Sequence, residues 1–313
     1  MERKMGKANR DAYGEVLVEL GKSNPDLVVL DADLSKSTKT DKFAAAFPER
    51  FFNVGIQEAN LVGVAAGLAS AGKIPFISSF ACFLICKGFE QFRMSVAFPE
   101  LNVKVVASHG GITVGEDGAS QMSIEDIALM TTLPGFDVIV PSDEFATRAL
   151  IKESLKKNAP LYMRTCRPKA AIIHSEKTKF EIGKGIRVRQ GKDVTLVATG
   201  LLVIEALEAA EVLAKEGIEA SVLDIHTIKP LDRNLILEEA RKTKHLVVCE
   251  EHQIWGGLGS AVAQVTAQGF PCKIEFVAVQ DTYAESGKPD ELMNKYGLSY
   301  PHIVKAAKKV LGG

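Results

Sequence analysis

Short apolar runs alternate along the first half of the chain with longer segments in which apolar residues recur at helical spacing. Continuous apolar runs separated by helices are typical of parallel strands whose two faces are both covered. The pattern therefore predicts an α/β domain with a mostly parallel sheet. The predicted strands are residues 27–30, 103–107, 138–140 and 161–163, and two of the predicted helices are residues 13–21 and 123–132.

The alternation stops at residues 175–193, which hold six Lys or Arg and three Gly and show no sustained period. We therefore predict two domains, residues 1–180 and 190–313, each a mostly parallel sheet covered by helices. In the second domain, Gly217 suits the position after a helix C-terminus and Asp232 suits a helix N-cap. Strands are predicted there at residues 194–198, 220–223, 246–249 and 273–277, and helices at 203–215, 234–243 and 258–268.

The composition is that of a globular protein, with 46% hydrophobic and 25% charged residues in 313. The 38 Lys and Arg balance 39 Asp and Glu, so charge gives no reason to expect nucleic acid or an anionic membrane as a partner. The five Cys are scattered without a Cys-x-x-Cys pair, which argues against a disulfide framework and a zinc site. The longest apolar run, residues 77–86, is too short to span a bilayer. We expect a soluble, cytoplasmic protein whose ligands are small molecules or proteins.

The first candidate for chemistry is Glu58, which follows a predicted strand end and opens a helix rich in Gly and Ala. A lone Glu at this place is usually a carboxylate that interacts favourably with the helix N-terminus. The functional interpretation is a semi-buried acid that exchanges a proton with a heterocyclic nitrogen. The spacing alone leaves both interpretations open.

Four Phe residues lie within the thirteen positions from Phe80 to Phe92. Aromatic residues at this density more often form core than a platform for a ligand. Together with the Glu58 segment, however, this run resembles the pyrimidine-binding domain of transketolases. The resemblance implies that Glu58 contacts the aminopyrimidine nitrogen of thiamine diphosphate and that Phe83 stacks on that ring, with Phe80 beside it. It also places Asp33 near the cofactor.

The resemblance extends over essentially the whole chain. An isolated Asp-Gly pair is usually only a turn, but the order and spacing of several such motifs together match the family. Two positions depart from common members. Gln121 replaces a second His, as in a branch that includes the vertebrate enzymes, and Cys86 stands where some members place a Tyr against the cofactor ring. The other matching segments are residues 8–14, 31–38, 108–126, 164–168, 227–232 and 286–289.

The resemblance implies that a two-carbon ketol unit is transferred from a ketose phosphate to an aldose phosphate with thiamine diphosphate. In this reaction Glu58 exchanges a proton with the cofactor. His109 binds sugar oxygens near the reacting carbonyl, and Asp117 orients a substrate hydroxyl.

A clamp for the substrate phosphate is also implied, formed by Arg10, Ser37 and Arg167. A guanidinium suits this role because it makes bidentate, charge-assisted hydrogen bonds to phosphate. Two arginines, Arg164 and Arg167, lie close together in the matching segment. The family's phosphate Arg follows a Ser directly, and the Cys166-Arg167 step matches that pattern, so we choose Arg167.

One half of the expected cofactor site has no counterpart in this sequence. Full-length transketolases begin with a domain whose Gly-Asp-Gly segment and a later Asn hold a divalent metal against the cofactor diphosphate. The only similar string here, Gly115-Glu-Asp-Gly118, has an inserted Glu. We therefore expect no metal ligands in this chain and a separate N-terminal subunit that holds the diphosphate and Mg²⁺ or a similar metal. The two subunits are expected to form a heterotetramer.

The second predicted domain offers less chemistry. Glu251-His252 and Gly256-Gly-Leu-Gly259 suggest a nucleotide-binding turn only weakly, because Gly before a helix is not a full fingerprint. We assign this domain to packing and dimerisation, as the family's C-terminal domain implies.

Three alternative functions stay open. Deoxyxylulose-phosphate synthase and the β subunits of 2-oxo-acid dehydrogenases share the two-domain plan, and the β subunits also share a split architecture. The segments 80–94, 115–122 and 286–289 favour transketolase over both. A non-catalytic thiamine-binding regulatory module requires an idle Glu58, and the joint presence of Glu58, His109, Asp117 and Arg167 argues against it.

Overall fold

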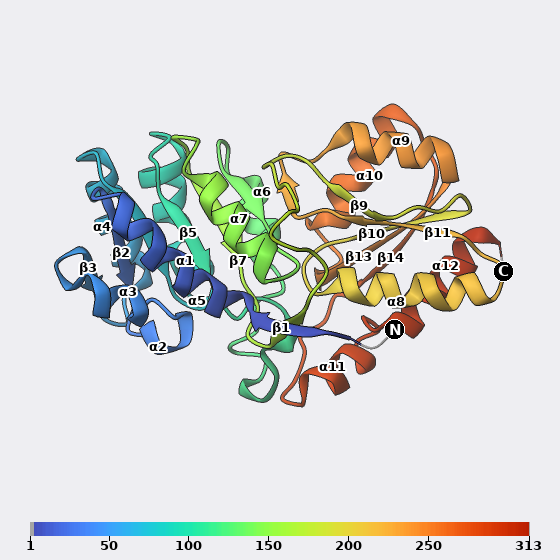
Figure 1. The fold of residues 1–313 in the computed structure, drawn as a ribbon, viewed down its shortest axis with the longest axis horizontal. Coiled ribbons are helices and arrows are strands. Elements are labelled where there is room, and N and C mark those ends of the chain that lie inside the picture. Colours follow the sequence, from blue (N-terminus) through green and yellow to red (C-terminus); the bar gives the residue numbers. More distant parts are fainter. Residues whose placement is uncertain (1–2, 313) are drawn as a thin grey trace.

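The computed structural model describes residues 3–312 as two α/β domains, each a sheet with helices on both faces (Figure 1). The predicted fold class is therefore confirmed. Residues 1, 2 and 313, the outermost positions of the two predicted domains, lie outside the described residues.

The first domain is built on a seven-stranded sheet. Its strands are β2 (Leu27–Asp31), β3 (Phe51–Asn53), β4 (Ile74–Ser78), β5 (Lys104–Ala107), β6 (Asp137–Ile139), β7 (Leu161–Arg164) and β12 (Thr227–Lys229). They are arranged in the order β12-β6-β7-β5-β4-β2-β3. All neighbours pair in parallel except the edge strand β12, which is antiparallel to β6. The central strands β2 and β5 are buried along their whole length, as their apolar runs predict.

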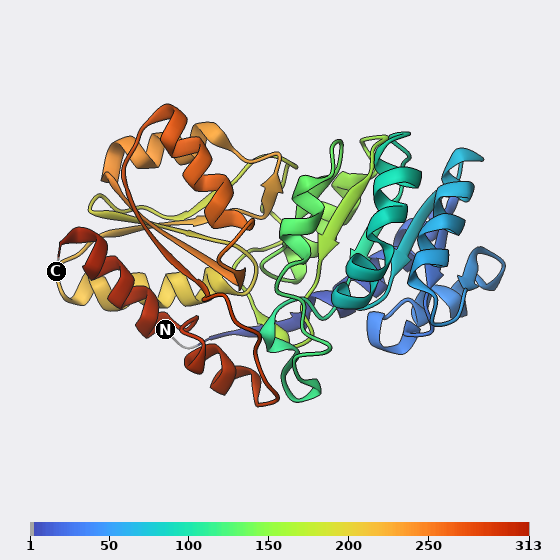
Figure 2. The ribbon, with the colours of Figure 1, turned by 180° about the vertical axis from the view of Figure 1, so that it is seen from behind.

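Helices cover both faces of this sheet. One face packs against α1 (Asn9–Ser23), α3 (Asp41–Ala46) and α7 (Glu144–Ser154). The opposite face packs against α4 (Glu58–Ser70), α5 (Ala81–Gln91), its π-helical continuation η2 (Phe92–Ala97) and α6 (Asp126–Thr132), which are seen from behind in Figure 2. Three short helices lie in the loops: α2 (Ser35–Thr38), η1 (Pro48–Arg50) and η3 (Ile112–Asp117).

The second domain has a five-stranded sheet in the order β14-β13-β10-β11-β9, in which only β9 is antiparallel. Its strands are β9 (Ile186–Arg189), β10 (Val194–Ala198), β11 (Ala220–Asp224), β13 (His245–Gln253) and β14 (Lys273–Val279). The helices α8 (Leu202–Lys215) and α12 (Tyr300–Leu311) cover one face, α9 (Arg233–Thr243) and α10 (Leu258–Gly269) cover the other, and α11 (Pro289–Lys295) packs beside η3.

The two domains are joined by more than the polar stretch at residues 175–193. Strand β12 follows the first three strands of the second sheet in sequence but pairs with β6 of the first sheet. This three-residue strand before Pro230 is too short to show a period, so it could not be predicted from the hydrophobic pattern. Buried residues of both domains also belong to one apolar cluster, for example Val140 and Val197. Near the N-terminus, β1 (Met5–Ala8) pairs with β8 (Lys169–Ala171).

Two local predictions in the second domain are confirmed. Gly217 follows the C-terminus of α8 with φ of 83°, a left-handed conformation that glycine adopts without strain. Asp232 caps α9, and its carboxylate accepts a hydrogen bond from the Leu235 amide. Across residues 3–312, no helix combines the length and the apolar character needed to cross a membrane.

Candidate active site

The residues proposed from the sequence gather at one edge of the first sheet. Asp33 follows β2, Glu58 follows β3, Phe80 follows β4, His109 follows β5 and Arg167 follows β7. These five strands are consecutive neighbours in the sheet, β7-β5-β4-β2-β3. Because the carboxyl ends of parallel strands open at the same edge, residues far apart in sequence meet there, at the usual place for a ligand site in such sheets.

Glu58 is the first residue of α4, and only 2% of its surface is exposed. Its carboxylate has two long contacts. The Ser79 hydroxyl donates to Oε1 at 3.3 Å, and Lys87 Nζ lies 3.4 Å from Oε2. The Lys87 ammonium also lies 4.8 Å from the centre of the Phe83 ring. A buried carboxylate with such weak partners retains the capacity to accept a hydrogen bond from a ligand.

Three flat rings connect the Glu58 region to the segment 108–126, which carries the predicted sugar contacts His109 and Asp117 and is called the sugar loop below. Phe80 and Phe83 stack with ring centres 5.7 Å apart, and Phe80 stacks on the His109 imidazole at 3.7 Å. The parallel bridge between Phe80 and Ser108 fixes this arrangement through the backbone. The predicted cofactor contacts and the predicted sugar contacts therefore form one continuous surface.

His109 is buried and has φ of 60°. Burial lowers the pKa of its imidazole to about 3, and the nearby Arg10 and Arg167 cations add to this effect. The ring is therefore neutral at physiological pH, with one nitrogen that donates and one that accepts. Its Nδ1 lies 2.9 Å from the Ser108 hydroxyl. This leaves Nε2 as the nitrogen that can meet a sugar oxygen.

Arg10 lies at the start of α1 and is partly buried. Its Nη1 donates to the main-chain oxygen of Ser37 at 3.0 Å, whereas its buried Nε has no hydrogen-bond partner. Burial lowers the pKa of Arg10, and the Arg167 cation contributes to the lowering while Asp117 opposes it. An unsatisfied, buried guanidinium donor near a second cation indicates room for an anionic ligand.

The structure separates the two candidate arginines. Arg164 is 5% exposed along its side chain, lies 3.4 Å from Asp126, and donates to the Ser123 carbonyl at 2.7 Å. Arg167 is 33% exposed and pairs with Glu116 at 2.9 Å. The geometry thus commits Arg164 to packing inside the protein and leaves Arg167 where a ligand can reach it.

The two proposed acids, Asp33 and Asp117, are exposed at the same edge of the sheet. Asp33 has φ of 66° and accepts a hydrogen bond from Asn53 at 2.9 Å. Asp117 ends η3 and lies close enough to Arg10 to affect its pKa. Asn53, Ser79, Lys87 and Ser108 were not singled out from the sequence, because nothing in their spacing distinguishes them from other polar residues.

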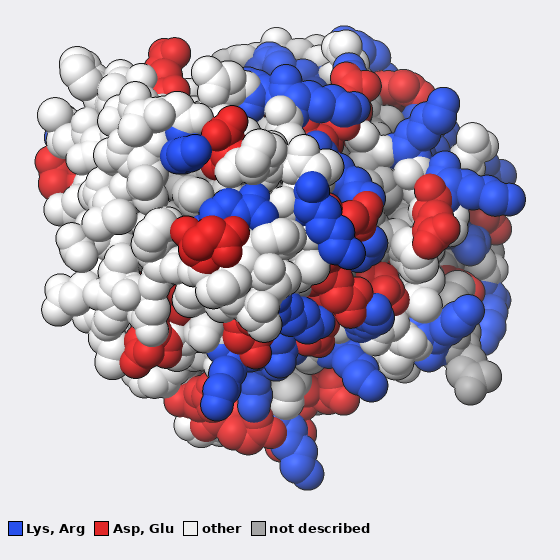
Figure 3. All heavy atoms as spheres, turned by 60° about the vertical axis from the view of Figure 1, so that its left-hand side comes forward, with Lys and Arg blue, Asp and Glu red and all other residues white. Residues whose placement is uncertain are grey.

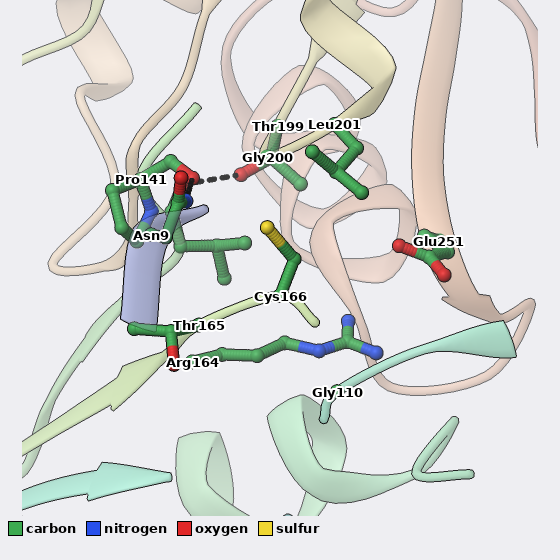
Figure 4. Close-up of a pocket in the computed structure, with 11 residues that line it drawn as sticks. Asn9, Gly110, Pro141, Arg164, Thr165, Cys166, Thr199, Gly200, Leu201 and Glu251 are labelled. Carbon is green, nitrogen blue, oxygen red and sulfur yellow. Dashed lines mark hydrogen bonds between the residues drawn. The ribbon is translucent and has the colours of Figure 1, made fainter. Parts of the chain in front are cut away.

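The loop that carries His109 is held between the two domains. A Cβ on Gly110 would lie 2.0 Å from Arg164 Nε, and one on Gly111 would lie 2.2 Å from the carboxyl carbon of Glu251. Gly110, Arg164 and Glu251 line a cavity of about 20 Å³ to which both domains contribute (Figure 4). Sequence reasoning missed Glu251 as a neighbour of this loop, because it belongs to β13 of the second domain.

The glycine-rich turn of the second domain does not present free amides. The N-terminus of α10 is occupied by the Glu250 carboxylate, which accepts hydrogen bonds from the Leu258 and Gly259 amides at 2.8 Å each. A Cβ on Gly257 would lie 2.1 Å from the same carboxylate. These glycines therefore serve close packing, and the weak resemblance to a nucleotide-binding turn has no support in the geometry.

Within residues 3–312, no group of three or more His, Cys, Asp or Glu side chains is arranged to hold a metal ion.

The acid and stacked rings at the strand ends, followed by a second α/β domain, define proteins with a pyrimidine-binding domain joined to a transketolase-type C-terminal domain. Residues 5–171 match the family model "Transketolase, pyrimidine binding domain", and residues 183–303 match "Transketolase, C-terminal domain". The chain belongs to the transketolase family, which confirms the resemblance stated from the sequence.

Several relatives match along almost the whole chain. A protein of Methanocaldococcus jannaschii described as a transketolase C-terminal section is 48% identical over 96% of this chain and 95% of its own length. A 6-deoxy-6-sulfo-D-fructose transketolase subunit of a Clostridium species is 42% identical over 96% of this chain and 94% of its own. A solved split-gene transketolase, described as an inactive β4 tetramer, is 50% identical with a TM-score of 0.92, covering 98% of this chain and 99% of that one. The chain spans about half the length of the full-length transketolases that it matches, such as the human enzyme.

Proposed function

We propose that this chain is the C-terminal subunit of a split transketolase, which transfers a two-carbon ketol unit from a ketose phosphate to an aldose phosphate. The observation that carries the proposal is the continuous surface from the buried Glu58 through Phe83, Phe80 and His109 toward Arg10 and Arg167. A buried carboxylate, two stacked Phe rings, a neutral imidazole and two nearby guanidinium groups support the roles of proton exchange, cofactor stacking, sugar binding and phosphate binding. The resemblance between sequences supports the same assignment.

The residues present fit the aminopyrimidine half of thiamine diphosphate. Glu58 has unused acceptor capacity beside the face of Phe83, and that face is approached by the exposed Lys87 ammonium, which can swing into solvent. Glu58 holds a proton at a ring nitrogen, and Phe83 with Phe80 fixes the plane of the ring. When bound, the cofactor supplies the carbanion stabilisation that allows a carbon–carbon bond to break and form. Asp33 completes the predicted cofactor contacts.

The sugar-binding residues divide the substrate into a reacting end and an anionic end. The neutral His109 binds an oxygen near the reacting carbonyl, and Asp117 orients a hydroxyl. Arg10, Ser37 and Arg167 hold the terminal phosphate, and the unpartnered Arg10 Nε supports this role. The Clostridium relative is described as acting on a sulfonated sugar, so a sulfonate is the second anion to test at the same arginines.

The partner subunit is proposed to bind the face of the first domain beside Glu58. Figure 3 shows that a broad part of this end of the molecule carries few charged side chains. On α4, Gly63, Val64 and Gly67 are exposed, and so are Met94 on the adjoining η2 and Phe98 directly after it. An N-terminal subunit bound here supplies the diphosphate and Mg²⁺ site, and pairs of both chains form the heterotetramer. The inactive β4 form described for the solved relative supports a role for a second kind of chain.

The test combines the chain with its candidate N-terminal subunit. We expect the chain alone to bind thiamine diphosphate weakly and to show no ketol transfer from xylulose 5-phosphate to ribose 5-phosphate. Adding the partner should restore both. Robust turnover by the chain alone would contradict the split-subunit proposal.

The same assay separates the alternatives. A deoxyxylulose-phosphate synthase or a 2-oxo-acid dehydrogenase β subunit turns over pyruvate, and the latter also binds a lipoyl domain. A regulatory module shows no turnover in any combination. The relatives described as transketolase favour ketol transfer. The five cysteines are all unpaired, in keeping with the proposed cytoplasmic location.

A further inference from the structure

The sugar loop crosses the interface between the domains with an unusual backbone path. Between His109 and Gly118, four residues have positive φ: His109 at 60°, Gly111 at 84°, Gly115 at 82° and Gly118 at 83°. Glycine adopts positive φ without strain, so the strain lies at His109, where it persists only because surrounding contacts fix it. Two main-chain hydrogen bonds come from the first domain, from the Gly111 amide to Ser123 and from the Gly110 amide to Thr165.

A further hydrogen bond comes from the second domain. The Thr113 amide donates to Glu251 Oε1 at 2.7 Å. Burial raises the pKa of Glu251, while the charge of Arg164 and hydrogen bonds from the Thr113 and Ile112 amides act in the opposite direction. The carboxylate therefore neutralises the positive ends of two successive amides at the start of η3. The carboxylate therefore ties the start of η3 to the second domain.

The neighbouring Glu250 provides a natural comparison. It is equally buried, on the same strand β13, and its carboxylate also accepts hydrogen bonds from two successive amides, those of Leu258 and Gly259. Because side chains alternate along a strand, the two acids point to opposite sides of β13. Glu250 holds a helix of its own domain, whereas Glu251 holds the loop of the other domain.

We infer that Glu251 is a positioning residue for substrate binding, which places the second domain in control of the sugar loop. This rests on the proposed function, because it assumes that His109 and Asp117 bind the ketose. The loop carries His109 before the Glu251 contact and Asp117 after it. Its η3 segment also provides Val114 O and Glu116, the two groups that contact Arg167. A shift of η3 therefore displaces the contacts to both ends of the sugar while leaving Glu58 and Phe83 in place.

The first experiment compares Glu251→Gln with Glu250→Gln in the complex with the N-terminal subunit. For Glu251→Gln we expect the KM for the ketose phosphate to rise by about 10- to 100-fold, with a smaller fall in kcat, because misplacement by about 1 Å has effects of this size. The affinity for thiamine diphosphate should not change. Both variants should lower the unfolding temperature by similar amounts, but Glu250→Gln should not raise the KM for the ketose phosphate. An unchanged KM in Glu251→Gln, or an equal rise in both variants, would overturn the inference.

The second experiment uses the chain alone and needs no activity. Hydrogen exchange at the Ile112 and Thr113 amides should become faster in Glu251→Gln and remain slow in Glu250→Gln, where the Leu258 and Gly259 amides exchange faster instead. If Glu251→Gln does not fold, Glu251→Asp keeps the charge on a shorter side chain and should show the same pattern to a smaller extent. Unchanged exchange at Ile112 and Thr113 contradicts the inference. A wild-type complex without ketol transfer contradicts only the proposed function.

Discussion

The carboxyl ends of the two sheets face each other across the cavity between the domains, and the polar side chains at these ends differ in what they bind. In the first domain, Glu58 has only contacts of 3.3 and 3.4 Å, and Arg10 Nε has no partner. In the second domain, Glu250 accepts hydrogen bonds from two amides at 2.8 Å each, and Glu251 Oε1 accepts one from the Thr113 amide at 2.7 Å.

The comparison shows that the carboxyl ends of parallel strands can serve two purposes, ligand binding in the first domain and support of neighbouring segments in the second. Polar groups with spare hydrogen-bonding capacity are available to a ligand, whereas groups that already have short contacts brace the neighbouring domain. The ligand-binding function therefore follows from which side chains stay unsatisfied, and the sheet alone does not assign it. The predictions below test that division.

The largest effect is expected at Glu58. In the assembled complex, Glu58→Gln should lower ketol transfer by about 10²- to 10⁴-fold, because a positioned proton-transfer group contributes a factor of this size. Circular dichroism and assembly should be unchanged. The control is Glu90→Gln on α5, where the acid is 65% exposed and should have no effect on the rate. Near wild-type turnover of Glu58→Gln would show that this acid is only a helix-terminal charge.

The next effect concerns the uncharged face of the first domain. Val64→Glu places a charge on the exposed side of α4, where it is buried unpaired when the partner binds. Affinity for the N-terminal subunit should fall by about 100-fold or more, measured by titration calorimetry, and the fold should be retained. Val64→Ala is the matched control and should bind nearly normally. Equal affinities for both variants would place the partner elsewhere.

Arg167→Ala should raise the KM for phosphorylated sugars by about 10- to 100-fold, in line with the roughly 1.5 to 3 kcal/mol of a charged hydrogen bond, while kcat changes little. The unphosphorylated donor hydroxypyruvate is the control. If its KM rises as much, Arg167 is structural.

Arg164→Ala tests the other side of the comparison, since breaking its buried pair with Asp126 should cost about 3 to 5 kcal/mol of stability.

Two histidines should give opposite pH dependences of stability. Burial lowers the pKa of His174, but its hydrogen bond to Asp224 and the charge of that acid outweigh burial and raise it. The stabilisation that protonated His174 contributes is therefore complete below the pKa of about 6.5 that it has in the unfolded chain. It is lost as pH rises through the higher pKa that His174 has in the folded protein. His109, with a pKa of about 3, destabilises the fold as pH falls from neutrality toward that value. The free energy of unfolding in urea should be measured as a function of pH. His174→Gln should remove the loss of stability with rising pH, and His109→Gln should remove the loss of stability with falling pH. Slopes that survive these substitutions would contradict the assignments.

The smallest effect is expected at Lys87, whose exposed ammonium contacts Glu58 and the Phe83 face. An exposed ion pair contributes about 0 to 1 kcal/mol. Lys87→Met should therefore tighten cofactor binding in the complex by up to about fivefold, because the ammonium no longer competes for Glu58. Weaker binding in this variant would mean that Lys87 itself contacts the cofactor.

Much of the fold could be predicted from the sequence, because many of its elements depend on residues that are close together along the chain. The strand at β2 and the cap at Asp232 each depend on residues within a few positions of one another, so periodicity and capping chemistry identify them. Strand β12 could not be predicted, because three residues carry no period and its partner β6 is almost ninety positions away. The candidate site residues were proposed through family resemblance, and their roles stay predictions.

By itself, the sequence determined the α/β class and the acid, aromatic and arginine segments that the family shares. Only the tertiary structure decided which of two nearby arginines stays accessible, and that Glu251 contacts the sugar loop. The reason is that hydrogen-bond satisfaction depends on neighbours brought from distant parts of the chain: Thr113 and Glu251 lie 138 positions apart and meet only when the two domains pack. The sequence shows which polar groups are present, and the tertiary structure decides which of them already have hydrogen-bond partners.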